Sequence, residues 1–385
     1  MTPHLRFAIV SDPHVALPHT VWRSPNRFHL VEVSIPALEQ VFDHLSSLEL
    51  DCVLMPGDLT QHGERENHDW LAQRLAALPF PVYVVPGNHD IIQRQGTDKT
   101  VGLSEFFQRY QAFGYDQQPY YLESLKPGIW LVGLNSIAFD PAGEQLYTGY
   151  LDQAQLDWLD QTLPQLRGDT VLVMIHHNVL EHLPGQSAST MGQRYMLKNA
   201  AALRSRLHSA NALLLTGHLH VQDIAEQDGL WEITTGSLVS YPHPYRTVEM
   251  VVDEGRSQLS VQTHWVKAVP EWPDLLAHSH QWMSDRALPF MTKLLTSAPL
   301  HLEPEQAAQI APQLKDFWAA IAAGDAQFDF AHLPDLLQRH FERFSAVDAQ
   351  GQPRLIDNFA TLELGKSSLI DPQKGNYSAA SILSS

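Results

Sequence analysis

Short apolar runs and longer amphipathic stretches alternate along the chain as far as Gly217. The apolar runs are rich in Val, Ile and Leu, which is typical of buried β-strands. The stretches between them repeat apolar positions every three or four residues, as amphipathic helices do. The expected strands are Leu5–Val10, Cys52–Met55, Val82–Val85, Ile129–Leu134, Thr170–Ile175 and Ala212–Leu215. The expected helices are Ile35–Leu48, Trp70–Leu78, Leu151–Leu166 and Met196–Leu207. This alternation predicts an α/β domain.

Beyond Gly217 the helical pattern stops, and strand-like segments follow one another directly. These segments are Trp231–Ser237, Thr247–Val252 and Gln258–Trp265. Residues Asp253–Ser257, with the sequence DEGRS, separate the last two segments and have the composition of a hairpin turn. We therefore expect this part of the sheet to be an antiparallel meander.

The pattern changes again near Val269, where VPEWPD introduces two prolines. Helical periodicity resumes in Leu275–Leu295, Pro304–Ala323 and Leu333–Phe344. About the last forty residues, ending in SAASILSS, are expected to be irregular. We predict an α/β domain in residues 1–267 and a helical C-terminal extension with an irregular tail in residues 270–385. Aromatic residues of the extension would form its own core, or pack against the α/β domain or a second subunit of a homo-oligomer.

Composition narrows the classes of partner. Asp and Glu outnumber Lys and Arg by 43 to 25, giving a formal net charge of −18. Duplex nucleic acid and anionic membranes are bound through basic residues, so this excess of acidic residues argues against both, while a small phosphoester remains a suitable substrate.

The single cysteine, Cys52, allows no intramolecular disulfide. The N-terminal apolar run is too short for a signal peptide, and none approaches the roughly 20 residues of a membrane-spanning helix, so we expect a cytoplasmic protein.

Polar clusters follow five of the predicted strands directly. They are SDPH with Asp12 and His14, PGDLTQHG with Asp58, PGNHD with Asn88, His89 and Asp90, IHHN with His176 and His177, and TGHLH with His218 and His220. Side chains at the carboxyl ends of α/β strands converge at one edge of the sheet. Carboxylate, amide and imidazole groups without thiolates suit Mn, Fe, Zn, Co or Ni ions. The clusters therefore predict a metal site.

The spacing of residues within each cluster predicts where their side chains point. Asp12 and His14, like His218 and His220, would point the same way if the backbone stayed extended, because side chains alternate along a strand. Leu219 would then point into the core. The glycines Gly57, Gly87 and Gly217 each precede a candidate ligand and would allow sharp turns close to the ions.

Each cluster by itself also has an ordinary structural explanation. Asp12 would serve as a helix cap, Asn88 is a common turn residue, and the histidines would be polar ends of core strands. Five clusters in succession, each at a strand end, favour the metal site over these separate explanations.

The ordered set D-x-H, GD, GNHD, H and GHxH resembles the calcineurin-like metallophosphoesterase superfamily. Over residues 5 to 265 the chain is most similar to class III cyclic-nucleotide phosphodiesterases and to bacterial relatives with a helical C-terminal extension. The segments Gly149–Leu163 and Trp130–Ser136 resemble framework pieces of that group. The resemblance implies a four-layer α/β/β/α sandwich with two metal ions at its edge, Mn, Fe or Zn being expected.

The same resemblance implies a role for each site residue. Asp12, His14 and His220 would hold one ion, Asn88, His176 and His218 the other, and Asp58 both. His89 would protonate the leaving alkoxide or steady the phosphoryl oxygens. The implied activity is hydrolysis of a small phosphodiester, such as a 3',5'-cyclic nucleotide, by metal-activated hydroxide. The alternatives are a phosphomonoesterase or pyrophosphatase acting on a nucleotide, sugar phosphate or lipid precursor, or a non-catalytic scaffold. The scaffold is disfavoured because every ligand position carries a suitable residue.

Three further residues have two interpretations each. Asp90 would either orient the His89 imidazole through a hydrogen bond or serve the fold alone. His177 would lie beside the metal ligands or face the substrate. His62 would be exposed on a loop, with contact to the substrate as the alternative.

Overall fold

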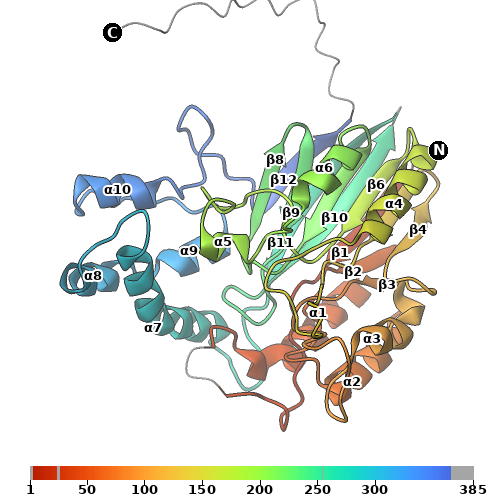
Figure 1. The fold of residues 1–385 in the computed structure, drawn as a ribbon, viewed down its shortest axis with the longest axis horizontal. Helices are drawn as coiled ribbons and strands as arrows, with labels where there is room; N and C mark the ends of the chain where they lie inside the picture. Colours follow the sequence, from red (N-terminus) through yellow and green to blue (C-terminus); the bar gives the residue numbers. More distant parts are fainter. Residues whose placement is uncertain (1–2, 24–26, 254, 366–385) are drawn as a thin grey trace, which may run out of the picture.

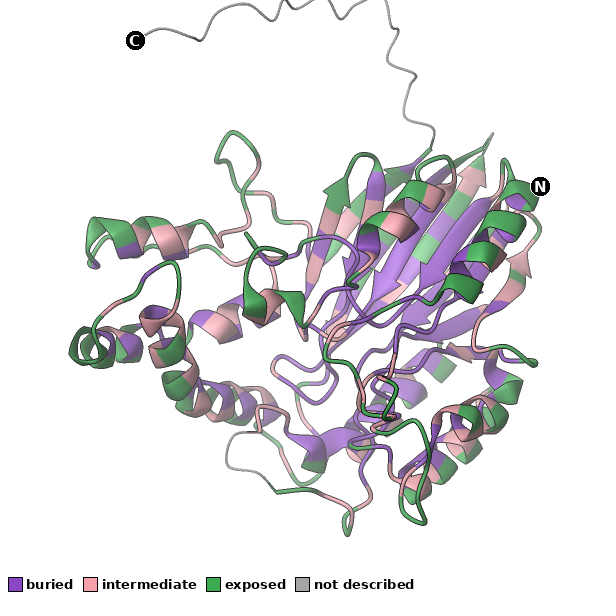
Figure 2. Ribbon diagram, in the orientation of Figure 1, coloured by how far each residue is buried: buried purple, intermediate pink, exposed green. Residues whose placement is uncertain are grey.

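The computed structural model describes residues 3–23, 27–253 and 255–365. Two six-stranded sheets stack face to face, and helices cover their outer faces (Figure 1). The predicted four-layer α/β/β/α sandwich is therefore confirmed, and a helical region follows it in the chain. Figure 2 shows buried strands in the middle of the sandwich and exposed residues on the outer surfaces of the helices.

The first sheet has the order β12-β11-β10-β1-β2-β3. Strands β1, β2 and β3 are parallel, whereas β10, β11 and β12 add to β1 in antiparallel fashion. Its strands are β1 (His4–Ile9), β2 (Cys52–Met55), β3 (Val82–Val84), β10 (Pro244–Asp253), β11 (Arg256–Trp265) and β12 (Phe359–Leu364). The predicted hairpin is confirmed, since Asp253 of β10 pairs with Arg256 of β11.

The second sheet has the order β4-β5-β6-β7-β9-β8. Strands β5, β6, β7 and β9 are parallel, and the edge strands β4 and β8 are antiparallel to their neighbours. Its strands are β4 (Tyr121–Lys126), β5 (Ile129–Gly133), β6 (Thr170–Met174), β7 (Asn211–Thr216), β8 (Asp223–Gln227) and β9 (Leu230–Thr234). The expected antiparallel meander is wrong for β9, which returns parallel to β7 after the β8–β9 hairpin.

Alternation along β6 explains why its sequence is apolar throughout. Leu172 and Met174 belong to the core between the two sheets, while Val171 and Val173 belong to the core beneath the outer helices. A strand buried on both faces needs apolar residues at every position. The polar edge strands β4 and β8 lack this signal because they are partly exposed, and the sequence did not predict them.

Helices pack on the outer face of each sheet. Those on the first sheet contribute Phe42, Leu71 and Phe106 to its core, and those on the second contribute Leu159 and Leu203. The helices of the sandwich are α1 (Ser34–Ser46), α2 (Arg65–Ala76), α3 (Leu103–Arg109), α4 (Gln153–Thr162), α5 (Thr190–Gln193) and α6 (Ala200–Leu207). Short 3-10 turns are η1 (Val31–Val33), η2 (Gln111–Phe113) and η3 (Leu163–Leu166).

The C-terminal region has its own apolar core, which includes Phe317, Phe330 and Phe341. It comprises α7 (Leu275–Thr296), α8 (Pro304–Ile310), η4 (Ala311–Leu314), α9 (Phe317–Ala323) and α10 (Asp335–Glu342). Within the residues that the structure describes, no helix has both the length and the apolar character needed to cross a membrane.

The expected irregular tail is wrong for Phe359–Leu364, which forms β12 at the edge of the first sheet. Leu362 and Leu364 are buried against the core while their neighbours face outward. Two buried positions in a short edge strand give too weak a periodic signal to stand out in a sequence. The remainder of the predicted tail lies outside the described residues, and the division into 1–267 and 270–385 stays a prediction.

Candidate metal centre

The loops after β1, β2, β3, β6 and β7 meet at one edge of the sandwich and bring the predicted site residues together. Ligand atoms of Asp12, His14, Asp58 and His220 all lie within 4.8 Å of one another. Those of Asp58, His176 and His218 form a second group within the same limit. Asp58 therefore belongs to both groups.

In the first group, nitrogen and carboxylate atoms face one another across a small space. His220 Nε2 lies 3.0 Å from Asp12 Oδ1 and 3.4 Å from His14 Nε2. His14 Nε2 lies 3.7 Å from Asp58 Oδ2. Asp12, His14 and Asp58 are buried, whereas His220 is partly exposed. Several lone pairs therefore face one another, and neutral imidazoles have too few N–H groups to pair with all of them. A cation bound among these atoms would accept the lone pairs.

In the second group, His176 is the central residue. Its Nε2 lies 3.4 Å from Asp58 Oδ1 and 3.1 Å from the side-chain oxygen of Asn88. Asn88 is partly exposed and so borders the open side of the site. The two oxygens of Asp58 thus face different imidazoles, Oδ2 toward His14 and Oδ1 toward His176.

Backbone carbonyls determine which nitrogen of three imidazoles carries a proton. Nδ1 of His176 lies 2.8 Å from Pro56 O, and Nε2 of His218 lies 3.2 Å from Arg194 O. Nδ1 of His89 lies 2.7 Å from Gln61 O. Because a carbonyl only accepts hydrogen bonds, these nitrogens must donate, and the opposite nitrogen of each ring is left to face the site.

The expected extended backbone at the site is wrong. Positive φ angles occur at Asp12 (49°), His14 (42°), Asp58 (50°), His218 (66°) and His220 (59°). Such left-handed conformations are unfavourable for residues other than glycine, and their concentration here is typical of functional sites. The left-handed turns, rather than strand alternation, point each pair of side chains into the site. Leu219, between His218 and His220, is buried, but in the apolar cluster of the C-terminal helices rather than in the core of the sandwich.

All three predicted glycines permit close approach, and a Cβ atom on Gly57, where φ is 96°, would overlap the His176 ring. A Cβ atom on Gly87 would overlap the backbone nitrogen and carboxylate of Asp58. One on Gly217 would overlap the side chains of Ser11 and Asp12. Any larger residue at Gly87 or Gly217 would displace a carboxylate of the site.

Asp90 does not orient His89, so that interpretation is wrong. Its buried carboxylate accepts hydrogen bonds from the backbone amides of Leu59, Thr60 and Gly87 at 2.8–3.1 Å. Burial, together with the neighbouring Asp58, raises the pKa of Asp90 to about 7. Asp90 therefore ties the loop carrying Asp58 to the loop carrying Asn88.

His177 and His62 contact different residues of the site. The His177 ring is buried, pairs with Ser136 Oγ at 2.8 Å, and packs 4.3 Å from the ring of His218. It supports a candidate ligand and does not face a substrate. His62 is exposed, as predicted, and its ring lies 5.8 Å from that of His89.

One imidazole at the site was not predicted from the sequence. The ring of His29 lies 4.6 Å from that of His14 and 4.5 Å from that of His220. His29 follows no apolar strand and no glycine, so no local signal distinguishes it from other histidines of the chain.

Most imidazoles of the site are held neutral. Burial lowers the pKa of His14 and His29 well below the usual value, and that of His218 to about 3. Burial also opposes protonation of His176, but the adjacent Asp58 carboxylate outweighs it and raises that pKa to about 9. Neutral imidazoles offer lone pairs, and with the carboxylates they form a donor set that fits divalent transition metals.

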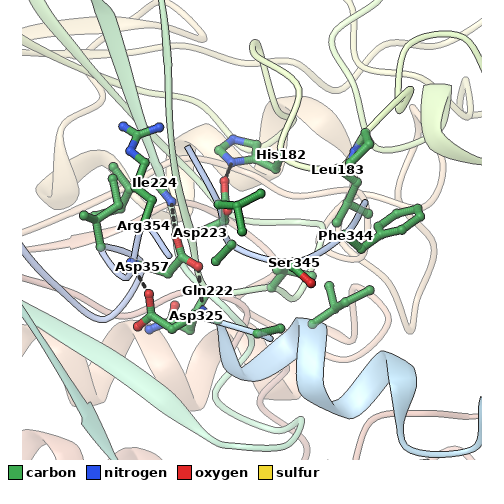
Figure 3. A pocket seen from close by; sticks show the side chains of 18 of the residues that line it. His182, Leu183, Gln222, Asp223, Ile224, Asp325, Phe344, Ser345, Arg354 and Asp357 are labelled. Carbon is green, nitrogen blue, oxygen red and sulfur yellow. Dashed lines mark hydrogen bonds and ion pairs between the residues drawn. The ribbon is translucent and has the colours of Figure 1, made fainter. Parts of the chain in front are cut away.

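A separate pocket lies between β8 and the C-terminal region (Figure 3). His182 and Asp223 meet on one side of it, with Nδ1 2.6 Å from Oδ2. Asp325 and Asp357 lie on the other side, where each carboxylate accepts the other's backbone amide. None of the predicted metal ligands lines this pocket.

Residues 5–222 match the Calcineurin-like phosphoesterase family, and the chain belongs to it. The chain is a metal-dependent phosphoester hydrolase, similar to relatives named as phosphodiesterases. It is 30% identical over 174 residues to a 3',5'-cyclic-nucleotide phosphodiesterase of Nostoc sp., covering 45% of this chain and 56% of the relative.

Two other relatives are matched over a larger share of their own length. A probable cyclic nucleotide phosphodiesterase of Synechococcus sp. is 27% identical over 242 residues, covering 61% of this chain and 84% of the relative. A probable glycerophosphodiester phosphodiesterase of Arcobacter nitrofigilis is 27% identical over 218 residues, covering 55% of this chain and 70% of the relative. The crystal structure of a dimetal phosphatase from Danio rerio aligns with a TM-score of 0.50 at 18% identity, over 66% of this chain and 95% of that one, which supports the fold.

Proposed function

We propose that the chain is a dimetal phosphodiesterase whose substrate is a small phosphodiester, with a 3',5'-cyclic nucleotide as the candidate. The observation that carries this proposal is the position of Asp58. One of its oxygens lies 3.7 Å from His14 and the other 3.4 Å from His176, so a single carboxylate is placed to bridge two ions. Asp90 accepts three backbone amides of the fold, whereas Asp58 accepts one among the described residues and otherwise faces imidazoles.

The two groups around Asp58 supply the proposed ligands. Asp12, His14 and His220 would hold one ion, and Asn88, His176 and His218 the other, with Mn, Fe or Zn as the expected metals. When bound, two such ions acidify a water molecule and stabilise charge on the phosphoryl oxygens. The cytoplasmic location and a homo-oligomeric state stay predictions.

His89 is the proposed general acid. The Gln61 carbonyl accepts its Nδ1 proton, which leaves Nε2 on the other side of this partly exposed ring available to a substrate. Its backbone amide donates to Asp58 Oδ1 at 2.8 Å, so the ring is fixed relative to the bridging carboxylate. A protonated Nε2 at this position would give its proton to the leaving alkoxide.

An aromatic surface beside His89 supports a nucleotide over an aliphatic diester. Trp22 is 56% exposed, and its ring stacks on that of His62 at 5.5 Å. The His62 ring in turn lies 5.8 Å from His89, on the proposed leaving-group side. Flat exposed rings at this position would stack against a nucleobase. The names of the Nostoc and Synechococcus relatives agree with this substrate.

A substrate panel tests the proposal. Cyclic AMP, glycerophosphocholine, bis-p-nitrophenyl phosphate and p-nitrophenyl phosphate would be compared under one Mn²⁺ condition. We expect both the cyclic nucleotide and the aryl diester to be hydrolysed faster than the monoester. Monoester turnover far above every diester rate would refute the phosphodiesterase, and a preference for glycerophosphocholine would refute the cyclic nucleotide alone.

A further inference from the structure

We propose that His29 is an additional ligand of the ion held by Asp12, His14 and His220. This inference rests on the proposed dimetal centre, and it makes the two ions chemically unequal. It assigns a role to residues 27–30, directly before η1, which contain none of the ligands implied by the family resemblance.

The geometry of His29 is that of a ligand. Its ligand atom lies within 4.8 Å of those of both His14 and His220, the same limit that the two proposed groups satisfy. Its ring meets both neighbouring rings edge to face, with interplanar angles of 77° and 70°. The three imidazoles of His14, His29 and His220 thus surround one point, with Nε2 of His14 and Nε2 of His220 3.4 Å apart. His89 belongs to no such group among the described residues, although its ring is 4.7 Å from His14.

The fold holds His29 in place from both sides. Leu30, the next residue, is buried, and its amide donates to Val239 O at 2.7 Å. Phe28, the preceding residue, packs against Phe290 of α7 with ring centroids 6.4 Å apart. The helical C-terminal region thus fixes the position of an imidazole at the metal centre, as a rigid support should for a ligand.

The consequence is a difference in metal preference. With His29, the first ion would have three imidazoles and two carboxylates, whereas the second would have two imidazoles, one amide and the shared carboxylate. Imidazole suits Zn, Fe and Co better than Mn, while oxygen-rich sites suit Mn. The His29 site should therefore retain its ion longer during chelation than the Asn88 site.

The test is metal binding by chelated full-length protein, measured by calorimetric titration with Co²⁺ and by the visible spectrum of the Co²⁺ form. The variant His29→Phe keeps a ring of similar size but has no lone pair. We expect two sites in both proteins, with the tighter one weakened about tenfold or more in the variant and its Co²⁺ absorption bands altered, since losing even an outer partner of a ligand costs about 10–100-fold.

Two variants control the experiment. His62→Phe removes an exposed imidazole near His89 and should bind both ions as the wild type does. His29→Gln restores an oxygen donor and should recover part of the lost affinity, which a purely structural defect would not. Thermal unfolding of the metal-free proteins establishes that the variants fold.

The outcomes separate this inference from the proposed function. If His29→Phe binds two ions with wild-type affinity and an unchanged Co²⁺ spectrum, His29 is not a ligand while the dimetal centre stands. If only the KM for a diester rises, His29 contacts substrate instead and the inference is overturned. If the wild type binds no ion, the proposed function itself fails.

Discussion

Two clusters of buried histidine and carboxylate groups lie close to the second sheet, and they differ in how their charges are satisfied. In the first, which we call the closed cluster, His182 lies between Asp223 and Glu232. Its Nδ1 is 2.6 Å from Asp223 Oδ2, and its Nε2 forms an ion pair with Glu232 Oε1 at 3.0 Å. Glu232 also accepts the amides of Val179 and Leu180.

In the metal centre, by contrast, nitrogens face nitrogens. His14 Nε2 and His220 Nε2 are 3.4 Å apart. A cluster in which a histidine lies between two carboxylates has its charges balanced within the protein. A cluster with an excess of lone pairs requires a cation from outside, and this difference distinguishes a structural site from a binding site.

Asp58→Ala is expected to have the largest effect, because it removes the carboxylate that joins both groups. Phosphodiesterase activity should fall to background, and the metal content should drop by at least one ion, as measured by elemental analysis. Metal-free protein should also lose some thermal stability, since Asp58 accepts the His89 amide and pairs with His176 in the buried site. A variant that retained two ions and turnover would contradict the bridging role.

His89→Ala separates catalysis from metal binding within the same site. Both ions should remain, while kcat for a diester with an alkoxide leaving group should fall about 10²–10⁴-fold, the range for loss of a general acid. Turnover of an aryl diester should fall less, because p-nitrophenolate leaves without a proton. Near wild-type turnover of the alkoxide diester would refute the general-acid role.

His182→Gln tests the closed cluster and should leave metal content unchanged. Burial would lower the pKa of His182, but Glu232 and Asp223 together raise it to about 10, so the folded state binds its proton more tightly than the unfolded chain does. Removing this cation leaves Glu232 buried without its partner and should reduce the free energy of unfolding by about 3 kcal/mol in denaturant titrations at neutral pH. His208→Gln, on an exposed residue, is the matched control.

The same pair of proteins gives a pH signature. A raised histidine pKa stabilises fully below the unfolded value of about 6.5, and the stabilisation is lost as the pH rises toward the folded value. The difference in stability between wild type and His182→Gln should therefore shrink from pH 7 to pH 10. The metal affinity, in contrast, should increase as the pH rises, because protons compete with metal ions for the same ligand atoms. A stability difference independent of pH would show that His182 acts through packing alone.

Local patterns in the sequence predicted the α/β domain and the convergence of the site, whereas the four-layer sandwich was implied by the family resemblance. Strands buried on both faces must be apolar throughout, and parallel strands present their carboxyl ends at one edge. Asp12, Asp58 and His176 each follow such a strand, so their approach to one another could be expected without a structure. The edge strands β4, β8 and β12 carried no comparable signal, since water faces half of each.

Tertiary structure alone decided the contacts between segments remote in the chain. For Asp90 the sequence left two interpretations open, and the structure selects the structural one, because its buried carboxylate accepts amides of the loop that carries Asp58. His29 reaches the centre only because Phe28 and Leu30 are held by segments more than 200 residues away. The sequence by itself determined which side chains could bind metal, through residue type and position after a strand. Which of them meet, and which histidine is satisfied by the fold instead, depends on packing between distant segments, and no local periodicity records it.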